Sequence, residues 1–95
     1  MNDIWELKLY VAGMTVRSQH AVQSVKEFCE TYLDGKYDLE VIDLYQNLNL
    51  AEKEQIIATP TLLKKTPPPV RRIIGDMRDK KRLILGLDLM SEYGS

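Results

Sequence analysis

Apolar and polar residues alternate in residues 4–11, which is typical of a strand with one buried face. From about residue 19 to residue 34 the apolar positions instead follow a period of 3.6 residues, which predicts a long helix with one buried stripe. Cys29 lies in that stripe, so we expect it to be a buried and unreactive side chain. Thr15 or Ser18 can cap this helix, because either hydroxyl can accept a hydrogen bond from a free N–H group of the first turn.

Residues 39–44 are mostly apolar and predict a second strand. We place this strand at the centre of a sheet, where both of its faces would be buried. A shorter helix follows and runs to about residue 57, with Asn49 as its cap and Glu52 three residues on in a capping-box arrangement. The order strand, helix, strand, helix predicts parallel strands that are joined by a right-handed crossover.

Prolines punctuate the second half of the chain. Pro60 cannot donate a hydrogen bond to a sheet, so it should open a third strand rather than lie inside one. The three prolines at 67–69 interrupt regular structure, and residues 70–75 then predict a fourth strand that turns at Gly75.

The end of the chain has two apolar periods at once. With a period of two residues, one face collects Leu83, Leu85, Leu87 and Leu89, as in a strand. With a period of 3.6 residues, one stripe collects Leu83, Ile84, Leu87 and Met90, as in a helix. Gly86 costs a helix interior about 1 kcal/mol relative to Ala, whereas Leu and Met favour a helix. We expect the helix to predominate and keep the strand as the alternative.

The 95 residues suffice for a single domain over residues 1–95 with a small core. No apolar run approaches the ~20 residues that span a bilayer, so we expect no membrane association and a cytoplasmic protein. The single cysteine excludes an internal disulfide and any Cys-x-x-Cys site. His20 is the only histidine, so we expect neither a metal site nor a bound cofactor.

Charge is unevenly spread along the chain. Residues 1–63 carry five basic and ten acidic side chains, whereas residues 64–82 carry eight basic and two acidic ones. Such a basic block indicates an acidic partner surface or nucleic acid, with an ordinary solvated face as the alternative. Nucleic acid is the weaker option, because no aromatic residue interleaves with these bases. We therefore expect no nucleic-acid partner.

The predicted order of elements, with a Thr-Pro pair before the third strand, resembles a thioredoxin-like α/β fold of order βαβαββα. In that fold the proline before the third strand follows a cis peptide bond, which the resemblance implies for Pro60. The turn that carries the redox cysteines in thioredoxins holds Thr15 and Ser18 here. Neither side chain can form a disulfide, so a redox enzyme is the least favoured function and we expect no catalytic residue.

Several segments resemble the KaiB family of circadian clock proteins more closely. They are residues 7–13, 40–44, 58–62, 67–76 and 86–89. The proline-arginine block and the closing Gly-Leu-Asp-Leu are the most specific of these. Residues 18–26 are also similar to the KaiB-like sensor domain of a clock histidine kinase, but that domain lacks the proline-arginine block.

The KaiB resemblance implies a non-enzymatic regulatory protein with two folds. One is a ground state, often a homotetramer, in which the C-terminal half is rearranged. The other is a thioredoxin-like monomer that binds the ATPase KaiC. Gly86 and Asp88 match positions where substitutions in the family bias the switch. The two apolar periods at the chain end supply one buried face for each fold.

The residues that we expect to contact a partner are His20, Asn49, Gln55, Arg71 and Arg72. A solvated surface is the alternative for His20 and the two arginines. Asp38 and Glu40 stand where clock KaiB proteins often have small or basic residues, so we hypothesise that binding to KaiA, the third clock protein, is impaired. The alternative function is a thioredoxin-like sensor or adaptor in two-component signalling or stress response without a rhythm.

Overall fold

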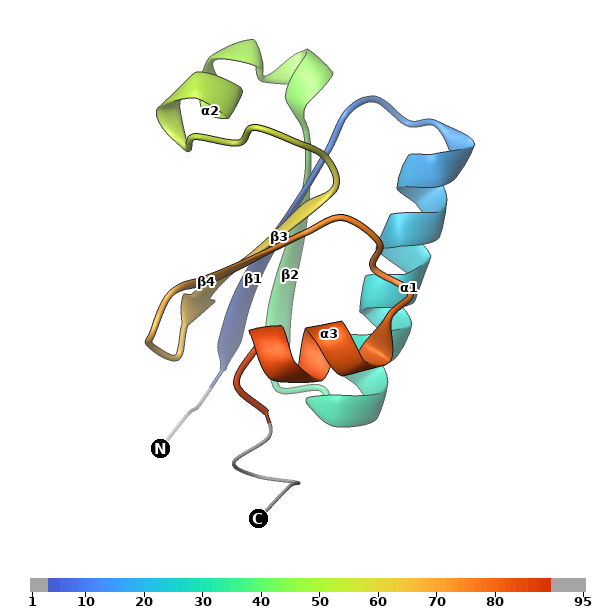
Figure 1. Ribbon diagram of the computed structural model, residues 1–95, viewed down its shortest axis with the longest axis vertical. Coiled ribbons are helices and arrows are strands. Elements are labelled where there is room, and N and C mark those ends of the chain that lie inside the picture. Colours follow the sequence, from blue (N-terminus) through green and yellow to red (C-terminus); the bar gives the residue numbers. More distant parts are fainter. Residues whose placement is uncertain (1–3, 90–95) are drawn as a thin grey trace.

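The computed structural model of the protein describes residues 4–89 (Figure 1). Its elements in chain order are β1 (Trp5–Val11), α1 (Val16–Tyr32), β2 (Tyr37–Asp43), a short 3-10 helix (Leu44–Gln46), α2 (Leu48–Lys53), β3 (Thr61–Thr66), β4 (Arg71–Ile74) and α3 (Lys80–Gly86). This order confirms the predicted βαβαββα fold. No helix within residues 4–89 is long and apolar enough to cross a membrane.

The four strands form one sheet in the order β2-β1-β3-β4. β1 runs parallel to β2, as predicted, whereas β1 with β3 and β3 with β4 are antiparallel. β2 is therefore an edge strand, and its predicted central position was wrong. Only Ile42 of this strand is buried, while Asp38 and Glu40 are exposed to solvent. The prediction failed because apolar content alone does not distinguish an edge strand with half-buried apolar residues from a central strand.

The sheet has a core on each face. α1 and α3 cover the same face, as Figure 1 shows, and pack against Leu7, Leu9 and Leu62. The 3-10 helix and α2 supply a smaller core on the other face, around Tyr10 and Leu63. Alternate residues of β1 thus enter different cores, as the two-residue period of a strand requires.

α1 begins at Val16, three residues earlier than predicted. Thr15 is its cap, because the Thr15 Oγ1 accepts a hydrogen bond from the Ser18 N–H at 3.1 Å. The predicted burial of Cys29 is confirmed, since this side chain has no exposed surface. Burial raises the pKa of the Cys29 thiol to about 12, which keeps it in the unreactive protonated form.

α2 differs from the prediction at both ends. Its N-cap position is Asn47, so the capping box that was predicted at Asn49 is wrong. The Asn47 side chain does not cap the helix, because its amide donates to the Asp43 carbonyl at 3.1 Å. The helix ends at Lys53 instead of running to about residue 57, and Gln55 just beyond it has a left-handed φ of +56°.

The end of the described chain is helical, as expected. Leu83 and Leu87 are buried, whereas Leu85 is 61% exposed, which is the pattern of the 3.6-residue period. Asp79 caps the helix by accepting a hydrogen bond from the Arg82 N–H at 3.2 Å. Met90, the last member of the predicted stripe, lies outside the described residues.

Gly86, the last residue of α3, lies directly against β4. A Cβ atom at this position would come within 2.6 Å of the Ile73 Cγ1 and 2.7 Å of its Cδ1. Ile73 is itself buried, so it has little room to move away. The sequence suggested that a helix would favour replacement of Gly86, but the contact with Ile73 opposes that gain.

We therefore expect Gly86→Ala not to stabilise the protein. The gain in helix propensity, about 1 kcal/mol, is offset by overpacking, which costs about 1–3 kcal/mol. In an Ile73→Ala background the overlap is removed, and the same Gly86→Ala change should raise the free energy of unfolding. Urea unfolding of the four proteins measures this coupling. Equal effects of Gly86→Ala in the two backgrounds would contradict it.

Candidate interaction surface

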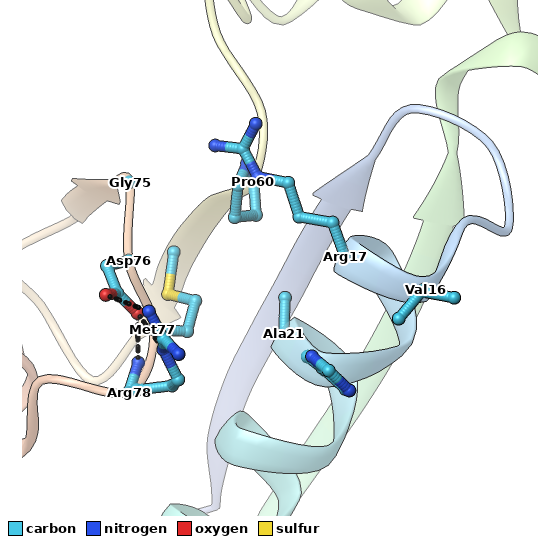
Figure 2. Close-up of a pocket in the computed structure, with 9 residues that line it drawn as sticks. Val16, Arg17, Ala21, Pro60, Gly75, Asp76, Met77 and Arg78 are labelled. Carbon is cyan, nitrogen blue, oxygen red and sulfur yellow. Dashed lines mark hydrogen bonds and ion pairs between the residues drawn. The ribbon is translucent and has the colours of Figure 1, made fainter.

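A hollow of about 410 Å³ lies between the first turns of α1, the loop before β3 and the segment that follows β4 (Figure 2). Its lining residues are Val16, Arg17, His20, Ala21, Pro60, Gly75, Asp76, Met77 and Arg78. The Thr59–Pro60 peptide bond beside it is cis. Gly75 brings the β4 end close by, since its φ of +108° turns the chain and its N–H donates to the Pro60 carbonyl at 3.0 Å.

The floor of the hollow is apolar and its rim is charged. Ala21, Pro60 and Met77 are buried. Arg17 and His20 are exposed on α1. Figure 2 shows the Arg17 side chain reaching from α1 toward Pro60.

The single carboxylate among the lining residues, that of Asp76, is already paired with an arginine of the protein. The Asp76 Oδ1 accepts hydrogen bonds from the Arg78 backbone N–H at 2.9 Å and from the Arg78 Nε at 3.0 Å, and its Oδ2 accepts one from the Arg78 Nη2 at 3.0 Å. These bonds lower the pKa of Asp76 to about 2. Arg17, by contrast, forms no ion pair with a carboxylate of residues 4–89.

The positions that carry redox cysteines in thioredoxins have a capping role here. The Thr15 Oγ1 donates a hydrogen bond to the Ser18 Oγ at 3.1 Å, in addition to capping α1. Cys29 is buried in the stripe of α1 that faces the sheet. The hollow therefore offers apolar contact and positive charge to a ligand, but no thiol.

The structure does not gather the predicted partner-binding residues in one place. His20 lines the hollow beside Pro60, while Asn49 and Gln55 are exposed in and after α2. Sequence reasoning missed Arg17, and also Asp76 and Arg78, as lining residues. Arg17 follows the predicted cap Thr15 by two residues, which places it on the first turn, but nothing in the sequence indicates that this turn meets residues 75–78.

The two arginines of β4 make intramolecular contacts. The Arg71 Nε donates to the Asp88 Oδ2 at 2.8 Å. The Arg72 guanidinium donates to the carbonyls of Glu54 and Gln55, at 2.7 and 3.1 Å. Arg72 thereby satisfies free carbonyls where α2 ends.

Most of the basic block is paired within the protein rather than presented to a partner. In addition to Arg71, Arg72 and Arg78, Lys65 lies 3.7 Å from the Glu54 carboxylate, and Arg82 donates to the carbonyls of Ile74 and Asp76. Only Lys80 and Lys81 of the block have no ion pair or side-chain hydrogen bond among residues 4–89. The block is therefore largely structural.

Lys64 of β3 is the buried member of the block, with 1% of its surface exposed. Its Nζ lies 3.7 Å from the Asp88 Oδ2 and 5.1 Å from the centroid of the Trp5 ring. Asp88 follows α3 and has a left-handed φ of +61°. Its carboxylate therefore joins the end of α3 to Lys64 on β3 and to Arg71 on β4.

Comparison with solved structures identifies the class of protein. The N-terminal domain of SasA from Synechococcus elongatus superposes with a TM-score of 0.79 at 27% identity, covering 100% of this chain and 91% of that one. The thioredoxin Deadhead from Drosophila melanogaster gives a TM-score of 0.67 at 17% identity, with 97% and 83% of the two chains covered. The protein is a thioredoxin-like domain that lacks the cysteine pair of the redox enzymes.

Sequence comparison then identifies the family. A model of the KaiB domain matches residues 8–89. The circadian clock oscillator proteins KaiB of Picosynechococcus sp. and Trichodesmium erythraeum are 54% and 52% identical over 92 residues, which is 97% of this chain and 88% of each relative. The chain belongs to the KaiB family, as its motifs predicted. The names of these relatives indicate no enzymatic activity.

The paired carboxylate of Asp88 leads to a prediction for acid stability. Its hydrogen bond with Arg71, and the nearby Lys64, hold the pKa of Asp88 below its ordinary value. A lowered pKa in the folded state means that this stabilisation is complete above the ordinary pKa, about 3.9, and is lost as the pH falls through the lower folded value. The free energy of unfolding should therefore fall less steeply with acidification in Asp88→Asn than in the wild type.

Urea unfolding between about pH 5 and pH 2 measures this difference. Asp38→Asn is the matched control, because it removes an exposed carboxylate that has no ion pair among residues 4–89. The control should retain the wild-type slope. Parallel curves for Asp88→Asn and the wild type would show that the Asp88 contacts do not stabilise the folded protein.

Proposed function

We propose that this protein is a non-enzymatic regulatory binding protein of the KaiB type, which acts in the cytoplasm and binds a KaiC-like ATPase in circadian or timing regulation. One observation carries the proposal: a chain with KaiB-family sequence has a thioredoxin-like fold, and an apolar hollow lies beside the turn where redox enzymes carry thiols. The thioredoxin-like form is the binding state in this proposal, and it acts as a monomer without a cofactor or metal.

The partner-binding face in this proposal is the hollow and its surroundings. His20 is exposed on its rim and can contact a partner directly. Asn49 and Gln55 do not line the hollow, so in this proposal a large partner contacts them separately, on and after α2. Arg71 and Arg72 contribute by holding Asp88 and the end of α2 in place, since each already donates to those groups.

The charge of the β2 edge disfavours one of the clock partners, KaiA. Asp38 and Glu40 are exposed there, and Lys8 lies 3.9 Å from the Glu40 carboxylate without neutralising the whole edge. A partner that adds a strand to this edge meets a negative surface. We propose that KaiA binding is impaired on this ground while KaiC binding is retained.

A second candidate is a sensor or adaptor role in two-component signalling. Its partner would be a clock histidine kinase. The likeness to the SasA N-terminal domain, which covers the whole chain, favours this role over a redox function. The two candidate functions differ in their partner, because only the first requires a KaiC-like ATPase.

The binding proposal is tested with the KaiC-like ATPase that is encoded in the same genome. The wild-type protein should co-elute with the ATPase in size-exclusion chromatography in the presence of ATP. His20→Ala should weaken this binding because it removes a rim contact, whereas Lys26→Ala, a matched change of an exposed residue farther along α1, should not. Absence of co-elution, or of any such ATPase in the genome, would contradict the proposal.

We also propose that the protein can adopt the second fold that the KaiB resemblance implies, in which the end of the chain forms a strand, and this second fold is tested at Leu85. This side chain is 61% exposed on α3, but in a strand it would share the buried face of the other three leucines. Leu85→Glu should therefore leave the thioredoxin-like fold intact and remove any rearranged or tetrameric species. Backbone chemical shifts across residues 60–89 and the solution mass measure both effects.

The control for the second fold is Leu87→Glu. Leu87 is fully buried in the thioredoxin-like state and lies on the shared leucine face of the strand, so this change should disrupt both folds. If Leu85→Glu unfolds the thioredoxin-like form as strongly as Leu87→Glu, the proposed difference between the two faces is wrong.

A further inference from the structure

We propose that the hollow beside Pro60 receives an apolar side chain from an acidic segment of the partner protein, with a carboxylate of that segment pairing with Arg17. The inference rests on the proposed binding function for its partner. It adds the chemistry that the partner segment must have and the residue that recognises it.

The apolar part of the proposal follows from the floor of the hollow. Ala21 and Met77 are 6% and 2% exposed, so they form a packed floor rather than flexible cover. The volume of about 410 Å³ lies within the range of roughly 300–1,000 Å³ that is common for ligand pockets. Val16, which also lines the hollow, is 68% exposed and extends the apolar contact area outward. An aromatic or large aliphatic side chain suits this floor.

The acidic part follows from which charges on the rim are already paired. Arg78 and Asp76 bind each other through three hydrogen bonds and leave little charge for a partner. Arg17 has no carboxylate partner among residues 4–89. The first turn of α1 contains no acidic residue, so nothing there offsets the guanidinium. The rim is thus positive, and a basic segment would be repelled.

A protein segment can contact both the apolar floor and the Arg17 guanidinium, whereas a small anion would contact only the guanidinium. Arg17 is exposed and belongs to no buried polar cage, so it would hold a free anion weakly. An apolar side chain that fills the floor excludes water beside the guanidinium and strengthens the neighbouring ion pair. The juxtaposition of the apolar floor and the unpaired cation therefore favours a polypeptide with an apolar residue flanked by Asp or Glu.

Charge reversal at Arg17 tests the inference. Arg17→Glu should weaken binding to the KaiC-like ATPase by about tenfold or more, as is common for the loss of a close charge pair. The wild-type affinity should fall with added salt more steeply than that of the variant. Lys26→Glu makes the same charge change on the same helix outside the hollow and should alter affinity by less than about twofold. Circular dichroism checks the fold, and a glutamate in the first turn favours the helix.

A second arm uses peptides and does not depend on the ATPase. Two short synthetic peptides carry a central Phe, flanked by Glu in one and by Lys in the other. In NMR titrations of the 95-residue protein, the Glu peptide should shift the amide signals of residues 16–21 and 75–78, and the Lys peptide should not. Arg17→Glu should abolish the shifts from the Glu peptide.

The outcomes separate this inference from the proposed function. If the ATPase binds the wild type and Arg17→Glu equally well, the inference is overturned and the proposed function stands. If the ATPase does not bind at all, the peptide arm decides: selective shifts support the inference while the proposed function fails. Equal shifts from both peptides, no shifts, or self-association through the hollow would each overturn it.

Discussion

Every other element of the fold is placed by the burial of β1 between two neighbouring strands. β1 pairs with β2 on one side and with β3 on the other, and it sends alternate side chains to opposite faces of the sheet. Leu7 and Leu9 anchor the core beneath α1 and α3, and Tyr10 anchors the core beside α2. Since a shift of one residue in β1 would exchange the two faces, this strand fixes the register of the whole molecule.

The C-terminal segment is held against this sheet by a small set of contacts from α3 and the residues that follow it. Leu83 and Leu87 pack on the sheet, Gly86 permits close approach to Ile73, and the Asp88 carboxylate joins two strands. A buried lysine without a carboxylate partner is costly, so Asp88 and Lys64 depend on each other. Small changes at the chain end can therefore have a large effect on how this segment packs against the sheet.

The elements whose apolar residues recur with a clear period could be predicted from the sequence. The position of each element in the sheet, and its neighbours in space, could not. The stripe of α1 and the proline before β3 indicated the correct structures, and the leucine run resolved into a helix as expected. β2 was misplaced because half-buried and fully buried strands have similar apolar content. The α2 cap was misassigned because Asn47 and Asn49 both suit the cap position, and the Asn47 side chain donates to the Asp43 carbonyl instead of capping the helix. The hollow was missed because it joins residues from three distant parts of the chain.

The opposite charges of the two sheet edges have a consequence for solubility. An acidic β2 edge and a basic β4 edge would, if both were free, attract each other head to tail between molecules and build an open filament. Arg71 is paired with the Asp88 carboxylate, whereas Arg72 donates to backbone carbonyls and keeps its charge, so the basic edge is partly neutralised. Two β2 edges repel each other through Asp38 and Glu40. The ion pair of Arg71 with Asp88 thus weakens the attraction between the sheet edges of neighbouring molecules.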